Sequence, residues 1–164
     1  MMDMTEKRKL KGLYAALSAI ILIVWMMFIF GMSAKSGEES AGLSFGIAKA
    51  LYGFPLNEKM IKFESFHTLI RKCAHFTEYG ILGILIVNFI HSCGRMWNWK
   101  VMIFVSGFCL IYAALDEYHQ SFVDGRGPSV GDVCIDTLGA VIFQVLIYIL
   151  LIRWKMKTLE CDIE

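Results

Sequence analysis

The segment "RKCAHFTEYGILGILIVNFIH", residues 71–91, joins charged and histidine side chains directly to an apolar run and decides how the chain folds. The apolar part alone, residues 81–90, is too short to cross a bilayer, because a membrane helix needs about 20 mostly apolar residues. The run reaches that length only when the helix begins near residue 70 and includes Arg71, Lys72, His75 and Glu78. We therefore predict a membrane span over residues 70–91 that carries these side chains into or beside the hydrocarbon.

The composition of the whole chain also indicates a membrane protein. Of its 164 residues, 57% are hydrophobic and 19% are charged, whereas soluble proteins average about 45–50% apolar and about 25% charged residues. The net charge of +1 gives no reason to expect a nucleic-acid partner. The five cysteines are scattered through apolar segments without a CxxC motif, so we expect apolar fillers rather than a disulfide framework. A bond between Cys73 and Cys134 is an open alternative.

Three further segments reach the length of a membrane span. Residues 13–32 are apolar apart from Ser18, residues 101–120 include the polar end 116–120, and residues 133–152 contain Asp136. We predict an all-α integral membrane protein that forms one domain over residues 1–164. Its fold class is a four-transmembrane-helix bundle with an interfacial amphipathic helix in the first loop, and its spans are at approximately 13–32, 70–91, 101–120 and 133–152.

The distribution of lysine and arginine predicts the orientation. These residues are concentrated before the first span, in the loop after the second span and in the C-terminal tail, whereas the loop after the third span has only Arg126. Cytoplasmic flanks carry the excess of positive charge, so we expect a multi-pass protein of the plasma membrane with both termini in the cytoplasm. The polar motifs of the spans and the loop 33–69 then face outward.

The outer loop contains an amphipathic pattern. Apolar residues recur at helical spacing at Leu43, Ile47, Leu51 and Phe54. This spacing predicts a helix on the membrane surface that ends at residues 53–55. A second helix is expected to begin at residues 57–58 and to continue into the second span. We expect the amphipathic helix to cover the bundle as a lid, and a gate for a lipid that enters sideways is the alternative.

Helical spacing gathers the polar side chains of three spans. Arg71, His75 and Glu78 share one face of a helix, and Asp132 and Asp136 lie one turn apart on another. The glycine-rich turn 124–128 returns Arg126 over the ends of the last two spans. We predict catalytic roles for His75, Glu78, Asp116, Glu117, Asp132 and Asp136, and substrate-binding roles for Arg71, Lys72, Tyr79, His119, Gln120 and Arg126.

Ionisable side chains inside a membrane protein usually mark a functional site. A histidine beside a carboxylate can act as a general acid or base, and arginine can bind a phosphate in bidentate fashion. Ion pairs that hold the helices together are the structural alternative. The pairs His75–Glu78 and Asp116–His119 resemble motifs of carboxylate metal bundles. Neighbouring cations oppose a metal, however, so we predict no firm cofactor and keep a divalent metal as the less favoured option.

Two other sets of residues receive structural roles or none. Gly83, Gly107 and Gly139 are expected to be positions of close helix packing. His67 and His91 lie away from the polar face, and we assign them no role.

Three motifs, in order and in spacing, resemble the VanZ family of small bacterial membrane proteins. They are "MSAKSGEES" (32–40), "RKCAHFTEYGILG" (71–83) and "DEYHQSFVDGRGPSVGDVCIDTLGA" (116–140). The resemblance extends from the first span to the fourth, and it implies a four-span protein and an association with resistance to teicoplanin, a lipoglycopeptide. Lys35 and Asp124 depart from the family pattern. The family's polar positions correspond to Arg71, Lys72, His75, Glu78, Asp116, Glu117, Gln120, Arg126, Asp132 and Asp136.

From these observations we predict a protein that acts on an anionic lipid or a lipid-linked cell-wall component at the outer leaflet. A hydrolase or transferase would use acid/base or metal-assisted chemistry. The alternative is a non-enzymatic binder of an envelope lipid or of a lipid-tailed antibiotic, and the sequence alone does not separate the two. A transporter is less favoured, because the chain shows neither an internal repeat nor a polar inner half. The expected partners are membrane lipids, lipid-linked cell-wall intermediates and lipoglycopeptide antibiotics.

Overall fold

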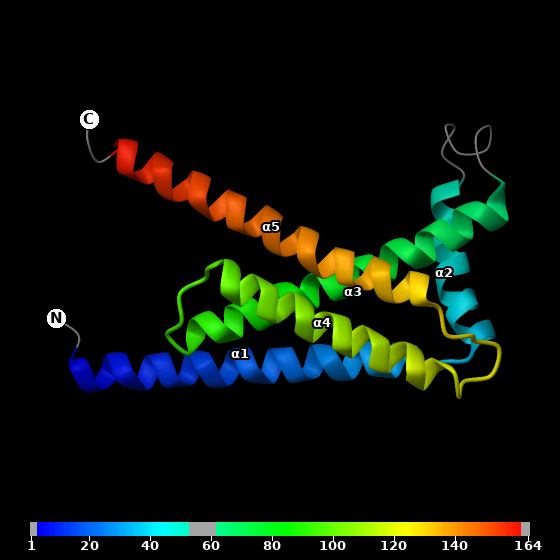
Figure 1. Cartoon of the computed structure of the whole chain (residues 1–164), viewed down its shortest axis with the longest axis horizontal. Coiled ribbons are helices and arrows are strands. Elements are labelled where there is room, and N and C mark those ends of the chain that lie inside the picture. Colours follow the sequence, from blue (N-terminus) through cyan, green and yellow to red (C-terminus); the bar gives the residue numbers. More distant parts are fainter. Residues whose placement is uncertain (1–2, 53–61, 162–164) are drawn as a thin grey trace.

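The computed structural model describes residues 3–52 and 62–161 and contains five helices within them (Figure 1). Four helices are long and apolar enough to cross a membrane, and one shorter helix lies between the first two of them. This arrangement confirms the predicted all-helical class with an additional helix in the first loop. The helices are α1 (Met4–Ser33), α2 (Gly37–Tyr52), α3 (Phe63–Ser92), α4 (Trp99–Gln120) and α5 (Val130–Cys161).

The four long helices run alternately in opposite directions (Figure 1). The α4–α5 loop and α2 lie at one end of the bundle, which we call the α2 end, whereas the start of α1, the α3–α4 loop and the last turns of α5 lie at the opposite end (Figure 1). Each predicted apolar segment lies inside one of these helices. The helices are longer than the apolar segments, because flanking lysine, arginine and glutamate residues are also good helix formers.

Helix α3 occupies the centre of the bundle, since it contacts each of the other four helices. Its buried residues include Tyr79, Leu82 and Ile86. These side chains join Val105 of α4 and Ala140 of α5 in one core cluster. The polar motif of residues 71–80 therefore lies on the helix that every other element packs against.

Small residues allow α3 and α5 to approach closely. A Cβ atom built on Gly139 would overlap the backbone of Phe76, and one built on Gly83 would come within 3.2 Å of the Ala140 carbonyl oxygen. The predicted packing roles of Gly83 and Gly139 are thus confirmed. The prediction for Gly107 is wrong, because a Cβ atom there would meet nothing within 4 Å.

Uncharged polar side chains link the helices away from the α2 end. Asn88 of α3 accepts a hydrogen bond from the Tyr14 hydroxyl at 2.5 Å and donates to Ser18 Oγ at 3.2 Å, both in α1. The fully buried Gln144 of α5 donates to Ser106 Oγ of α4 at 3.3 Å. Such hydrogen bonds stabilise helix association where no water competes. They were not predicted, since one Asn or Gln within an apolar run does not indicate its partner.

The first loop contains the predicted amphipathic helix as α2. Helix α3 continues without a break from Phe63 through Ile70 into the apolar run, as expected. Phe54, the predicted helix end at 53–55 and the predicted helix start at 57–58 lie outside the described residues. The structure therefore supports a surface helix followed by one long helix, with the connection between them undescribed.

Hydrogen bonds and ring contacts attach α2 to the bundle. The Gly37 N–H donates to the Asp124 carbonyl oxygen at 3.1 Å, which ties the start of α2 to the α4–α5 loop. Ser44 Oγ lies 2.6 Å from His67 Nε2, which ties the middle of α2 to α3. The ring of Phe63 stacks on His67 at a centroid distance of 6.4 Å. His67, for which no role was predicted, thus holds α2 against α3.

The four cysteines whose side chains the structure describes all have free thiols. Cys73, Cys93 and Cys134 are exposed and Cys109 is buried. The structure contains no bond between Cys73 and Cys134, and Cys109 packs in the core as a small apolar group.

We expect Gly139→Ala to destabilise the bundle, because the added methyl group would overlap the Phe76 backbone and separate α3 from α5. Overpacking of a filled core typically costs about 1–3 kcal/mol. Thermal unfolding of the purified protein in detergent should show a lower Tm. The matched control is Gly107→Ala, whose methyl group meets nothing within 4 Å and should leave the Tm unchanged or raise it. Equal Tm values for the two variants would contradict the close α3–α5 contact.

Candidate functional site

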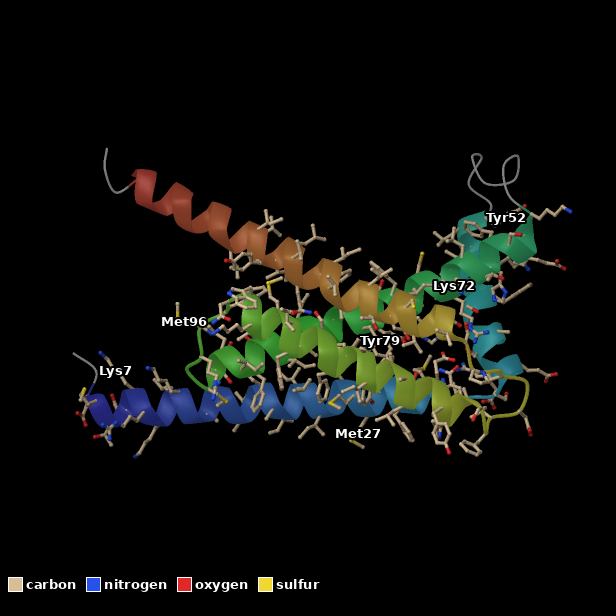
Figure 2. The ribbon with its side chains drawn as sticks, in the orientation of Figure 1. Lys7, Met27, Tyr52, Lys72, Tyr79 and Met96 are labelled. Atoms are coloured by element: carbon tan, nitrogen blue, oxygen red, sulfur yellow. The ribbon has the colours of Figure 1, made fainter. Side chains whose placement is uncertain are left out.

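Charged side chains of separate helices meet inside the bundle at the α2 end. Figure 2 shows Lys72 near this end, Tyr79 deeper between the helices, and Lys7 and Met96 toward the opposite end. The predicted convergence of polar motifs from distant segments is therefore present. Two cavities lie among these side chains.

The first cavity, which we call the α1/α2 cavity, has a volume of about 190 Å³. It is enclosed by α1, α2, α3, one side chain of α4 and one side chain of the α4–α5 loop. Apolar side chains form one part of its wall and charged side chains form the other. The lining residues are Ile29, Met32, Ser33, Ser40, Ser44, Ile47, Ile70, Arg71, Ala74, His75, Glu78, Asp116 and Arg126.

The second cavity, which we call the α5 cavity, has a volume of about 280 Å³ and lies between α3, α5 and the α4–α5 loop. Its wall is mostly polar. The lining residues are Thr68, Arg71, Lys72, His75, Gly125, Arg126, Gly127, Asp132, Ile135 and Asp136. Three side chains, Arg71, His75 and Arg126, line both cavities.

One ion pair connects α3 to α5 beside the α5 cavity. Lys72 Nζ lies 2.6 Å from Asp132 Oδ1. The two side chains are 42% and 27% exposed, so solvent screens the pair, and exposed pairs contribute at most about 1 kcal/mol. Lys72, predicted to bind substrate, and Asp132, predicted to be catalytic, thus form a bridge between two helices.

A second contact between α3 and α5, this one between a histidine and a carboxylate, lies deeper in the same cavity. His75 Nδ1 is 3.9 Å from Asp136 Oδ1, which is within ion-pair range for a protonated histidine but too long for a hydrogen bond. Asp136 is 1% exposed, and neither of its carboxylate oxygens has a hydrogen-bond partner among the described residues. A buried acceptor without a partner is costly, so Asp136 has capacity for a ligand.

Arg126 has buried hydrogen-bond donors without a partner, whereas Asp136 has buried acceptors without one among the described residues. Its Nε and Nη1 atoms are buried without a hydrogen-bond partner in the described part of the chain. Burial lowers the pKa of the Arg126 guanidinium and the neighbouring Arg71 lowers it further, whereas Asp116, Glu117 and Glu78 raise it. Arginine nevertheless stays cationic in proteins. A buried cation with free N–H groups favours an anionic ligand with oxygen acceptors.

Two predicted substrate-binding residues lie away from both cavities. Tyr79 is fully buried in the core cluster, where its ring packs 6.2 Å from that of Tyr112 between centroids. His119 packs against Phe30 at a centroid distance of 4.4 Å. Both rings face other helices, which helical spacing alone could not distinguish from facing the site.

Two further predicted residues support the cavity walls instead of lining them. Gln120 donates to Asp116 Oδ2 at 3.2 Å and so orients a carboxylate of the α1/α2 cavity. The buried Glu117 accepts a hydrogen bond from the Ser129 N–H at 2.8 Å. This bond holds the loop that carries Arg126 against the end of α4.

The geometry offers little to a metal ion. Within residues 3–52 and 62–161, no three His, Cys, Asp or Glu side chains lie close enough together to hold one. Neither His75 with Glu78 nor Asp116 with His119 belongs to such a group. The free N–H groups of Arg126 are suited to anion binding, and His75 beside Asp136 is suited to proton transfer.

Three serines of the α1/α2 cavity were missed. Ser33 is 2% exposed at the end of α1, and Ser40 and Ser44 lie one turn apart on α2. A signal was present, since Ser33 and Ser40 lie within the motif "MSAKSGEES" and Ser44 follows Ser40 by one helical turn. Which face of α2 meets the bundle, however, follows from its contacts with α3 and the α4–α5 loop.

Comparison with known proteins agrees with the resemblance noted in the sequence. A family model described as VanZ/LLP1 matches residues 18–152, which include all residues that line the two cavities. The chain therefore belongs to the VanZ/LLP1 family. No curated protein and no solved structure matches it.

Proposed function

We propose that this VanZ/LLP1 protein binds the anionic headgroup of an envelope lipid, with the phosphate held between Arg71 and Arg126. The observation that carries the proposal is that two buried Arg126 nitrogens beside the α1/α2 cavity have no hydrogen-bond partner among the described residues. Two guanidinium groups suit a phosphate, because each can donate two hydrogen bonds in a plane.

The apolar wall of the α1/α2 cavity favours a lipid over a free anion. Ile29, Met32 and Ile70 line the cavity beside the arginines, and Ile47 both lines it and is 58% exposed on the surface. A headgroup with acyl chains would contact both the charged and the apolar wall. An inorganic anion would leave the apolar wall without a partner.

The orientation that we propose places the α2 end at the outer leaflet. Arg95 lies in the α3–α4 loop and Lys100 in the first turn of α4, both at the opposite end, where the rule of positive flanks expects the cytoplasm. A site at the outer leaflet is accessible to lipid-linked cell-wall components and to lipid-tailed antibiotics. The predicted association with teicoplanin resistance is compatible with this placement and remains a proposal.

Acid/base chemistry on the bound headgroup is the second candidate function. His75 lines both cavities and lies 3.9 Å from Asp136. An imidazole in this position can accept or release a proton beside a ligand, with the carboxylate as its electrostatic partner. Such an enzyme would bind the same lipid and convert it.

Cysteine labelling tests the orientation. In a chain whose native cysteines are replaced, Asp124→Cys in the α4–α5 loop should react with a membrane-impermeant maleimide on intact cells. Met96→Cys, at a position that is 74% exposed at the opposite end, should react only after the cells are permeabilised. The reverse pattern would place the site at the cytoplasmic leaflet.

Loss of a guanidinium tests lipid binding. We expect Arg126→Gln to weaken binding of phosphatidylglycerol by about tenfold or more, because hydrogen bonds to charged groups contribute roughly 1.5–3 kcal/mol. Native mass spectrometry of the purified full chain in neutral detergent would measure the affinity. The matched control is Lys62→Gln, which removes an exposed cation at the same end that lines neither cavity. Equal affinities of Arg126→Gln and the unaltered protein would refute the proposed phosphate site.

Lipid conversion tests the second candidate. Incubation of the protein with the lipid that it binds, followed by mass spectrometry of the lipid, should reveal a product if the protein is an enzyme. We then expect His75→Gln to slow conversion by about 10²–10⁴-fold, the usual contribution of an acid or base, and to change the affinity only a few-fold. Tight binding by the unaltered protein without any product would refute the enzymatic function and support lipid binding without conversion.

A further inference from the structure

We infer that the ligand extends through both cavities, with its acyl chains toward the α1/α2 cavity, its phosphate at Arg71 and Arg126, and a hydrogen-bond-donating headgroup at Asp136. This inference rests on the proposed lipid binding and adds the direction and the class of the ligand. The class is a phospholipid or lipid-linked phosphate whose headgroup carries hydroxyl or amine hydrogens. Phosphate esters without such donors are excluded from the preferred class.

The shared wall is the first support. Arg71, His75 and Arg126 line both cavities, so a phosphate bound to the two arginines contacts each cavity. The cavities have volumes of about 190 Å³ and about 280 Å³. Each alone is smaller than the usual small-molecule pocket of about 300–1,000 Å³, whereas the two together reach that range. A ligand of ordinary size therefore needs both.

The opposite characters of the two cavities are the second support. Ile29, Met32, Ile47 and Ile70 line the α1/α2 cavity, and Ile47 leads to the surface. Among the lining residues of the α5 cavity, Ile135 is the only large apolar side chain. An amphiphile would place its apolar part in the first cavity and its polar part in the second, because each wall then meets matching chemistry.

Asp136 defines what the polar part must offer. Its two carboxylate oxygens are buried and have no hydrogen-bond partner among the residues described. His75 Nδ1 lies 3.9 Å from Asp136 Oδ1, and the Lys72 ammonium is paired with Asp132 at 2.6 Å. A ligand donor would satisfy these oxygens. The headgroup therefore presents O–H or N–H groups to α5.

Two matched lipid pairs test this inference on the unaltered full chain. Phosphatidylglycerol and phosphatidylethanol have the same charge, but only the first has headgroup hydroxyls. Phosphatidylethanolamine and phosphatidylcholine are both zwitterionic, but only the first has N–H donors. With equal acyl chains, native mass spectrometry should show at least about tenfold tighter binding of the donor-bearing lipid in one pair or both, since a buried acceptor left unpaired penalises the analogue. The pair that shows the preference identifies hydroxyl or ammonium as the donor.

Substitution of Asp136 locates the preference. Asp136→Leu, which keeps the approximate size and removes both acceptors, should abolish the difference within the preferred pair while phosphatidylethanol still binds. Asp124→Asn, on an exposed loop residue that lines neither cavity, is the control and should leave the difference unchanged. If Asp136→Leu does not fold, the affinities within the two lipid pairs, measured on the unaltered protein, still test the inference.

The outcomes separate this inference from the proposed function. Equal affinities within both pairs, with binding that still depends on Arg126, would overturn the inference and leave the phosphate site intact. A preference that Asp136→Leu retains would also overturn it. Absence of binding by any phospholipid would refute the proposed function, and the inference with it.

Discussion

The contact between Gly139 of α5 and the Phe76 backbone of α3 sets the register on which the polar site depends. His75 precedes Phe76, and Asp136 lies one turn before Gly139, so the same register brings these two side chains to 3.9 Å. One turn nearer the N-termini of both helices, the same register brings Lys72 to Asp132. A side chain larger than hydrogen at Gly139 would separate the helices and all these pairs at once.

Within this register, the charged groups do not neutralise one another completely. Lys72 and Asp132 form a short pair, whereas Arg126 and Asp136 each keep buried atoms without a partner in the described structure. Uncharged residues such as Asn88 and Gln144 connect the helices elsewhere in the bundle. These contacts and close packing already hold the helices together, so the unpartnered atoms of Arg126 and Asp136 support the proposed ligand site.

The sequence predicted those features that depend on length and spacing. Twenty-residue apolar runs specify spans, and the i, i+4, i+7 spacing of Arg71, His75 and Glu78 correctly placed them together in one cavity. Spacing does not specify what a helix face meets. Tyr79 was therefore assigned to the site although it lies in the core, and the bond between His67 and Ser44 was not foreseen because it joins separate helices. Glu117 was predicted as a catalytic residue and Gln120 as a substrate-binding residue, whereas the structure shows Glu117 bonded to the Ser129 N–H and Gln120 bonded to Asp116.

The hydrogen bond from Gly37 to Asp124 has a mechanical consequence. Asp124 lies two residues before Arg126, so the bond that anchors α2 also holds the short stretch of backbone that carries the guanidinium. A force that lifts the start of α2 from the bundle would therefore also act on the backbone beside this cation. Displacement of the start of α2 and displacement of the arginine would thus be coupled, and α2 presents exposed apolar side chains on which such a force could act.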